Sequence, residues 1–406
     1  MNPKDLSIQQ FGYELPQEKI AKHPLPERDS SKLLVYQSGG IRDHQFSEIS
    51  SIVPSNSLLL LNNTKVIHAR ILFKKSSGAH IEVFCLEPSN GNYEQTFNSF
   101  GECQWICMVG NLKRWKNETL SKEISVAGTP VTLEAKLISP LKDGFLIAFS
   151  WSAKSISFGK LLEYGGILPI PPYLNRDTES SDEEQYQTTF SKIEGSVAAP
   201  TAGLHFTAKL LEELKSNGIQ IGELTLHVGA GTFRPVKASR MEDHEMHKES
   251  IYVNLQTLRE VLKALENKNP IIPVGTTSLR TIESLYWFGV KLLFHKNKGN
   301  ELEVSQWDPY EMPDHIEPTK AIEAVILHMV DHNIQEISGY TQLLIAPGYK
   351  VKIADALVTN FHQPGSTLLL LVAAFVGDNW TKIYNHALIN DYRFLSFGDA
   401  SLLFRK

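Results

Sequence analysis

The sequence predicts an α/β protein with two parts. One is a body built on a mostly parallel, helix-covered sheet in a Rossmann-like α/β/α arrangement, and the other is a small all-β barrel inserted into it. Residues 70–156 alternate apolar and polar side chains in short stretches without a helical segment, which is typical of a barrel. After residue 157 the pattern becomes strand, polar loop, helix, and the strands carry few charges, as strands covered by helices do.

The barrel is predicted to interrupt the body. Residues 1–69 end in the apolar strand 58–61, and the alternation begins directly afterwards. We therefore assign 1–69 and 157–406 to one α/β catalytic body and 70–156 to the inserted domain. Within the insertion we expect strands at 80–86, 104–109, 131–138 and 145–149, separated by turn residues such as Asp143-Gly144.

The body is predicted to continue with alternating helices and strands. Thr207 is a suitable cap for a helix over 207–218, which would end at Gly218. Further strands are expected at 221–228, 271–275 and 343–346. Further helices are expected at 258–265, 277–284 and 366–375.

Composition narrows the class of protein. The chain has 406 residues with 45 acidic and 40 basic side chains, a net charge of −5, which argues against a general polyanion binder. Its longest apolar stretch, 368–376, is shorter than the roughly 20 residues of a membrane-spanning helix. No secretory signal is visible, and the three cysteines form no redox or zinc pattern. We expect a soluble, cytoplasmic protein that acts as a monomer.

Small, polar and histidine-containing segments follow four of the predicted strands. They are residues 200–207, 227–235, 275–280 and 359–367, and they include His205, His227 and His362. Because ligands of parallel sheets bind beyond the carboxyl ends of the strands, these segments are expected to form one site. Backbone NH groups, hydroxyls and imidazoles suit a sugar-bearing polar molecule and proton transfer near neutral pH.

Each of these motifs also has a plainer interpretation. Gly229 and Gly231 resemble the start of a dinucleotide fingerprint, but the third glycine is missing, so a tight turn is favoured. His244 and His247 have no evident third ligand, so we expect no metal site. A single buried histidine is usually structural, and for His205 and His227 the structural and functional interpretations stay open.

A weak basic bias marks the insertion. It holds ten basic and eight acidic residues, a net charge of about +2 on an acidic chain. Its segment Lys113-Arg114-Trp115-Lys116 is either a phosphate contact or an ordinary charged hairpin turn.

Taken together, the motifs resemble a known family. Segments such as 197–207 (VAAPTAGLHFT), 225–236 (TLHVGAGTFRPV), 274–280 (VGTTSLR) and 355–362 (DALVTNFH) are similar to the S-adenosylmethionine:tRNA ribosyltransferase-isomerases of queuosine biosynthesis. Matching segments run nearly from end to end. The sequence departs from the usual pattern at Asn63, Lys65, His68, Gln363 and Gly365, and losing an Arg or Lys there would weaken an anion contact.

The resemblance implies an activity. S-adenosylmethionine would be consumed as a ribosyl donor, and the acceptor would be 7-aminomethyl-7-deazaguanine at the wobble position of tRNA. The products would be epoxyqueuosine-tRNA, adenine and methionine, and no metal would be required. The family fold is an α/β body with an inserted β-barrel, in agreement with the residue patterns.

The resemblance also implies roles for particular residues. His205 and His227 would form the proton-transfer pair, in either order. The substrate-binding candidates are Thr201, Gly203, Gly229, Gly231, Thr232, Thr276, Thr277, Ser278, Arg280, Asp355, Asn360, His362 and Asp399, of which Arg280 or Asp399 would meet the ends of the methionine. The candidates for tRNA contact are Arg28, Lys65, Arg70, Lys113, Arg114 and Lys116.

Two other classes compete with this one. A tRNA methyltransferase using the same cofactor would need a glycine-rich loop after its first strand, but Asn62-Asn63-Thr64-Lys65 follows the strand 58–61. A catalytically silent tRNA-binding homologue would not need the histidine motifs, which are intact here.

Overall fold

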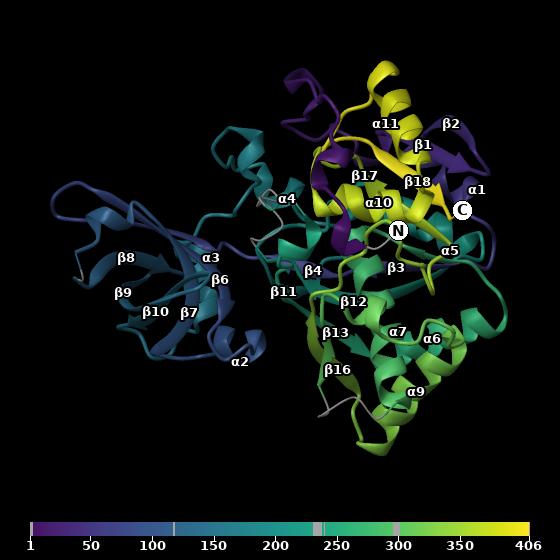
Figure 1. Cartoon of the computed structure of the whole chain (residues 1–406). Coiled ribbons are helices and arrows are strands. Elements are labelled where there is room, and N and C mark those ends of the chain that lie inside the picture. Colours follow the sequence, from purple (N-terminus) through teal and green to yellow (C-terminus); the bar gives the residue numbers. More distant parts are fainter. Residues whose placement is uncertain (1–2, 117, 230–237, 239, 295–300, 406) are drawn as a thin grey trace.

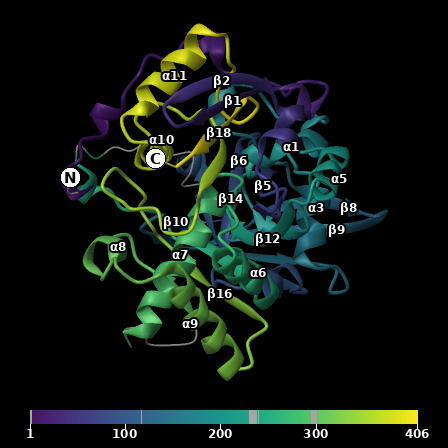
Figure 2. The same cartoon turned by 90° about the vertical axis from the view of Figure 1, so that its right-hand side faces the viewer.

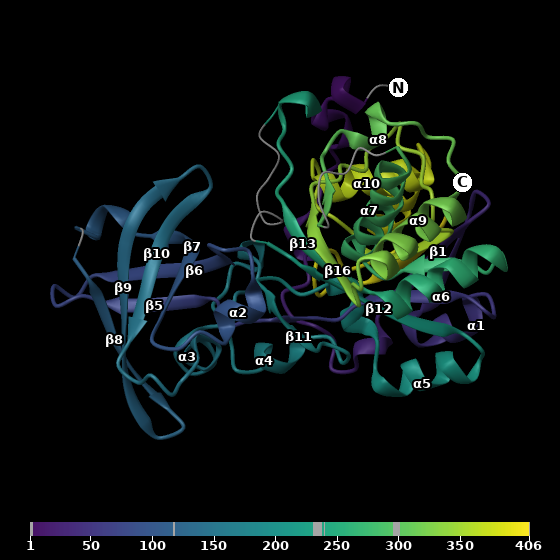
Figure 3. The same ribbon diagram turned by 90° about the horizontal axis from the view of Figure 1, so that it is seen from below.

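The computed structural model describes residues 3–116, 118–229, 238, 240–294 and 301–405. A curved antiparallel sheet lies to one side of a larger α/β body (Figures 1 and 3). The sheet is formed by residues between 70 and 151, and the segments before and after it form the body. None of the helices in these described ranges is long and apolar enough to cross a membrane.

Two mixed sheets form the centre of the body. The four-stranded sheet has the order β17-β18-β1-β2, and the six-stranded sheet has the order β14-β3-β12-β13-β16-β15. A parallel bridge between Val274 and Val358 joins the two. The strands are β1 (Lys32–Gln37), β2 (Gly40–Gln45), β3 (Leu58–Asn62), β12 (Gln220–His227), β13 (Glu249–Asn254), β14 (Ile271–Pro273), β15 (Leu302–Val304), β16 (Glu336–Thr341), β17 (Ala356–Asn360) and β18 (Ala400–Phe404).

The prediction of a mostly parallel, Rossmann-like body is not confirmed, because these sheets are mixed. The central neighbours β17, β14, β3 and β12 run parallel to one another, and so do the pairs β1–β18 and β15–β16. β13 is antiparallel to both β12 and β16, and β18 is antiparallel to β17. Apolar strands indicate burial on both faces, but they carry no information about the direction of the neighbouring strand.

Helices pack around this sheet assembly. Those outside the barrel region are α1 (Ile49–Ile52), α4 (Asp182–Gln185), α5 (Ala208–Ser216), α6 (Leu255–Glu266), α7 (Thr276–Leu293), α8 (Asp308–Glu311), α9 (Pro318–Asp331), α10 (Thr367–Val376) and α11 (Asn379–Ile389). α3 (Phe158–Gly165) instead packs against the other, antiparallel sheet. α7 is almost entirely buried and packs against α9. Figure 2 shows α10 and α11 at one end of the body with β1 and β2, and α9 at the opposite end.

A small parallel sheet pairs β4 (Thr64–Val66) with β11 (Ile193–Ser196), and the remaining sheet is wholly antiparallel. Its order is β5-β6-β7-β10-β9-β8, and its edge strands β5 and β8 contact each other, so it curls into a nearly closed barrel. The bounds are β5 (Arg70–Lys74), β6 (His80–Pro88), β7 (Glu102–Gly110), β8 (Leu120–Val126), β9 (Thr129–Leu141) and β10 (Gly144–Trp151), with helix α2 (Tyr93–Phe97) after β6. The predicted all-β character of this region is confirmed.

The barrel has its own hydrophobic cluster. Trp105 and Phe149 lie at its centre, and α3 adds Phe158, Leu161 and Leu162 from just beyond the predicted boundary. The division at 69/70 and 156/157 stays a prediction, because a shared cluster does not define where a folding unit ends.

Local sequence signals were mostly sufficient for single elements. Thr207 caps α5 by accepting a hydrogen bond from the Leu210 amide, as predicted. The helix over 366–375 is confirmed as α10, which Ser366 caps. The strand predicted over 343–346 is wrong, because these residues continue beyond β16 without a strand partner.

Candidate active site

Three of the four parallel strands at the centre of the body, β12, β14 and β17, end beside one cavity. Thr201, Thr276, Thr277, Asn360 and His362 all line it, so five of the predicted binding residues meet there. Tyr173, Tyr186 and Ser396, which were not predicted, complete its polar wall. None of the described residues that line this cavity carries a charged carboxylate, ammonium or guanidinium group. We call it the neutral cavity; it suits an uncharged heterocycle and its sugar.

The start of α7 forms one wall of the neutral cavity. Gly275 has φ +89°, a conformation that favours glycine, and it turns the chain from β14 directly into the helix. The free amide groups of the first helical turn are therefore available beside Thr276 and Thr277. Asn62 at the end of β3 donates a hydrogen bond to the Thr277 hydroxyl at 3.4 Å, and its side chain also bonds both backbone polar groups of Leu226 at 3.0 Å.

His205 lies behind this wall. The Asn360 amide donates to His205 Nε2 at 3.2 Å, while its carbonyl oxygen accepts from the Thr201 hydroxyl at 2.8 Å. Nε2 accepts, so Nδ1 carries the proton and donates to the Ser31 hydroxyl at 2.8 Å. Burial lowers the pKa of His205 to about 4, so the ring is neutral. Both ring nitrogens are thus engaged with protein groups.

His227 has a different environment. Its Nδ1 bonds the Thr64 hydroxyl at 2.9 Å, and that hydroxyl donates its proton to the Ile193 carbonyl at 3.4 Å. Nδ1 must therefore donate, which leaves Nε2 unprotonated, with no hydrogen bond to any described residue. Burial lowers the pKa of His227 to about 3. Gly195 permits this packing, because a Cβ there would lie 2.5 Å from Cε1 of the ring.

The end of β12 separates two ligand spaces. Val228 lines the neutral cavity, whereas His227 and Gly229 line a second cavity that faces the barrel. Successive residues of an extended chain point to opposite sides, which explains this division. Sequence reasoning placed His205 and His227 in one site, but the first lies behind the neutral cavity and the second borders the other space.

Several predicted binding residues lie elsewhere. Asp355 precedes β17, at the opposite end of the strand from Asn360, and its carboxylate accepts from the Ile271 amide. Asp399 accepts from the amides of Lys32 and Arg393, and the Ser278 hydroxyl donates to the Val274 carbonyl. Gly203 packs against the side chains of Phe190 and Thr188. Gly231 and Thr232 lie outside the described residues.

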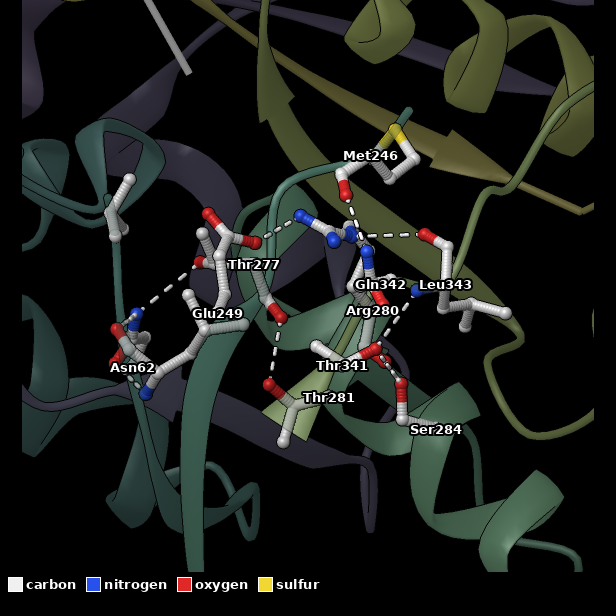
Figure 4. A network of polar contacts seen from close by, with 12 residues as sticks. Asn62, Met246, Glu249, Thr277, Arg280, Thr281, Ser284, Thr341, Gln342 and Leu343 are labelled. Carbon is white, nitrogen blue, oxygen red and sulfur yellow. Dashed lines mark hydrogen bonds and ion pairs between the residues drawn. The ribbon is translucent and has the colours of Figure 1, made fainter. Parts of the chain in front are cut away.

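Arg280 forms a buried ion pair rather than lining either cavity. Its guanidinium donates to the Glu249 carboxylate of β13 and, through Nε, to the Leu343 carbonyl at 3.2 Å (Figure 4). Nη2 is buried without a hydrogen-bond partner. Ser284 donates to the Arg280 carbonyl at 2.6 Å and bonds Thr341 at 2.7 Å, so the network ties α7 to the end of β16.

Three of the cations predicted to contact tRNA are engaged within the protein. Arg28 donates to the carbonyls of Glu184 and Gln187, each at 2.6 Å. Lys65 pairs with Glu194 at 3.0 Å, and Arg70 pairs with Glu82 through two nitrogens. In contrast, Lys113, Arg114 and Lys116 are exposed and form no ion pair with a described residue.

No metal-binding group is evident in the described part of the chain. Three or more His, Cys, Asp or Glu side chains do not gather there in a way that could hold an ion. The expectation that no metal is needed stays a prediction.

The fold and the neutral cavity define an α/β protein with a nucleoside-sized polar site at the ends of its central strands. A family model described as "Queuosine biosynthesis protein" matches residues 8–403, and the chain belongs to this family. Relatives named S-adenosylmethionine:tRNA ribosyltransferase-isomerase include one from Halothermothrix orenii, 37% identical over 98% of this chain and 100% of its own length. Another, from Pelobacter propionicus, is 34% identical over 98% of this chain and 99% of its own length.

A solved structure is also similar to this chain. It is the crystal structure of an S-adenosylmethionine tRNA ribosyltransferase from Thermotoga maritima, with 29% sequence identity and a TM-score of 0.47. The similarity covers 97% of this chain and 100% of that one.

The buried ion pair yields a prediction for stability. Replacing Glu249 by Gln leaves the Arg280 guanidinium buried without a counter-charge, and we expect the free energy of unfolding to fall by about 3–5 kcal/mol. Urea unfolding measures this change. The control is Glu311→Gln, which removes the exposed pair with Lys4 and should cost about 1 kcal/mol or less. Equal effects of the two substitutions would show that the buried pair has no special role.

The buried histidines yield a prediction for pH dependence. Burial lowers the pKa of His205 to about 4 and of His227 and His362 to about 3, below the value of about 6.5 expected in the unfolded chain. As the pH falls, the histidines of the unfolded chain bind protons before those of the folded protein. Their contribution to the free energy of unfolding is therefore fully present above about pH 6.5 and is lost as the pH falls toward 4. Each histidine adds a slope of up to about 1.4 kcal/mol per pH unit. His227→Gln should reduce the slope measured between pH 7 and 5; an unchanged slope would contradict the prediction.

Proposed function

We propose that this protein transfers and isomerises the ribosyl part of S-adenosylmethionine onto 7-aminomethyl-7-deazaguanine in tRNA. The products are epoxyqueuosine-tRNA, adenine and methionine. The names of the relatives support this activity. The structural observation that carries it is the convergence of Thr201, Thr276, Thr277, Asn360 and His362 on one cavity without charged side chains. A cytoplasmic location and a monomeric state belong to the same proposal.

The neutral cavity is the proposed site of the adenosine. Hydroxyls and the first amides of α7 offer hydrogen bonds to the ring nitrogens and the ribose, while the Asn360 side-chain amide already donates to His205 and to the Asp399 carbonyl. Burial lowers the pKa of His362 to about 3 and raises that of Tyr173 to about 12, so neither side chain is an efficient proton donor at neutral pH. Adenine would therefore leave with the help of hydrogen bonds rather than full protonation.

His227 is the proposed base. The sulfonium acidifies the C5′ hydrogen of the ribose, and Nε2 of His227 is the unprotonated nitrogen that would accept that proton. Thr64 fixes the tautomer through Nδ1. His205 is instead proposed as a positioning residue, because it holds Asn360 and contacts neither ligand space.

The activity is tested by supplying labelled S-adenosylmethionine and tRNA that carries the aminomethyl base. We expect adenine release and transfer of the ribosyl label to the tRNA. Methyl transfer would instead identify a methyltransferase, and neither reaction would identify a silent tRNA-binding protein.

The same assay separates the two histidines. His227→Gln removes the base and should lower kcat by about a hundredfold or more, with the affinity for S-adenosylmethionine largely kept. His205→Gln is the matched variant, since its side chain is also buried. It should mainly raise KM for S-adenosylmethionine by releasing Asn360. Near-normal kcat in the His227 variant would exclude it as the base.

The tRNA contact is proposed to include the exposed basic side chains of Lys113, Arg114 and Lys116. Replacing Lys113, Arg114 and Lys116 by Ala should weaken binding about equally for substrate and non-substrate tRNAs, because phosphate contacts carry no sequence information. The slope of log affinity against log salt should fall by roughly 0.7–0.9 for each lost contact. Binding of S-adenosylmethionine should not change. Unaltered tRNA affinity would place the contact elsewhere, with Arg176 and Lys192 as the next candidates.

A further inference from the structure

A cleft between the barrel and the body borders His227. From the barrel side it is lined by β6 and α2, and from the body side by β12, β13 and β16. These elements face one another in Figures 1 and 3. The residues that define what we call the acidic cleft are Glu87, Glu94, Glu301, Glu336, Tyr93, Tyr252, Tyr340 and His227.

The cleft carries an excess of negative charge. Glu87, Glu94, Glu301 and Glu336 form no ion pair with any described residue. Burial and the nearby Asp143 raise the pKa of Glu87. Burial and the nearby Glu94 raise the pKa of Glu336. Carboxylates that repel one another without a counter-ion favour the binding of a cation.

Two described basic residues beside the cleft, Lys192 and Lys248, do not neutralise these carboxylates. The Lys192 ammonium is bonded to both oxygens of Glu223, at 2.6 and 2.8 Å. The Lys248 ammonium lies over the Tyr340 ring, 5.9 Å from its centroid. It lowers the pKa of Glu87, but burial raises that pKa by more, so the net shift is upward.

The walls of the cleft are aromatic, and a largely buried histidine that lines it has one nitrogen without a hydrogen bond to a described residue. The centroid of the His227 ring lies 4.5 Å from the centroid of the Tyr93 ring and 5.5 Å from that of the Tyr252 ring. His227 is only 3% exposed, yet its Nε2 makes no hydrogen bond to any described residue. An unpaired nitrogen on a largely buried ring that lines the cleft points to a ligand independently of the carboxylates.

We propose that the acidic cleft binds the acceptor base, a flat heterocycle with a primary ammonium, between its tyrosines and carboxylates. The inference rests on the proposed function. It assigns the carboxylates of the cleft to the aminomethyl group, which distinguishes this base from guanine. Stacking on tyrosine accepts any base, so the carboxylates provide the selection for the aminomethyl group. The same charges repel phosphates, so only a base turned out of the anticodon loop enters the cleft.

The test uses the full-length protein and two tRNAs that differ only at the wobble base, guanine or 7-aminomethyl-7-deazaguanine. The variants are Glu94→Gln, Glu336→Gln and the double variant, which keep the side-chain shape and remove the charge. Glu18→Gln is the control, because Glu18 is equally exposed and lies outside the cleft. Dissociation constants are measured for both tRNAs and for S-adenosylmethionine, and thermal unfolding checks the fold of each variant.

We expect the wild type to bind the aminomethyl tRNA more tightly than the guanine tRNA. In the double variant the ratio of the two dissociation constants should fall about tenfold. The affinity for guanine tRNA should stay the same or rise, and the affinity for S-adenosylmethionine should not change. An unchanged preference would overturn the inference. Weaker binding of S-adenosylmethionine with an intact preference would also overturn it, because the cleft would then hold the sulfonium or α-ammonium of the donor.

The wild-type activity assay keeps the two proposals apart. If the wild type releases adenine but the variants keep full discrimination, the acidic cleft is not the acceptor site and the proposed function stands. If the wild type releases no adenine with the aminomethyl tRNA, the proposed function fails, whatever the two tRNA affinities are.

Discussion

The buried ion pair between Arg280 and Glu249 holds the two ligand spaces in a fixed relation. Arg280 lies one turn inside α7, whose first residues line the neutral cavity, and Glu249 begins β13, which borders the acidic cleft. Removing two charges from water is costly, and the attraction between them repays this only in good geometry. A shift of α7 against β13 would break that geometry. The pair therefore favours one arrangement of the helix and the strand over slightly displaced ones.

The sequence was sufficient for elements whose signals are local. Caps such as Thr207 and Ser366 lie within the segment that they start, so α5 and α10 could be predicted. Strand direction was not predictable, because β13 pairs with β12 and β16 through contacts between distant segments. The alternation in the barrel could be read directly, but α2 was missed because five residues show no clear helical period.

The candidate site was predictable in part for the same reason. Thr276, Asn360 and His362 lie at the ends of strands of the parallel centre, so the rule about strand ends brought them together correctly. Thr201 joins them from the segment after β11, which belongs to the separate two-stranded sheet. Asp355 belongs to a matching motif but precedes its strand, and only the structure shows that it lies at the far end. The carboxylates and tyrosines of the acidic cleft come from the barrel and from strands that are far apart in the sequence. No motif links them before the chain folds.

The charge difference between the two spaces fits the needs of the proposed reaction. An uncharged cavity with many hydrogen-bond donors stabilises a departing base without holding a counter-ion beside it. The acidic cleft suits a cationic acceptor, whereas the pKa of His227 is set by burial, which lowers it to about 3. The ring is therefore a weak base. A cation beside Nε2 disfavours the protonated ring further, whereas an unpaired carboxylate beside it favours protonation. The basicity of His227 thus depends on which groups occupy the cleft, which couples proton transfer to the presence of the acceptor.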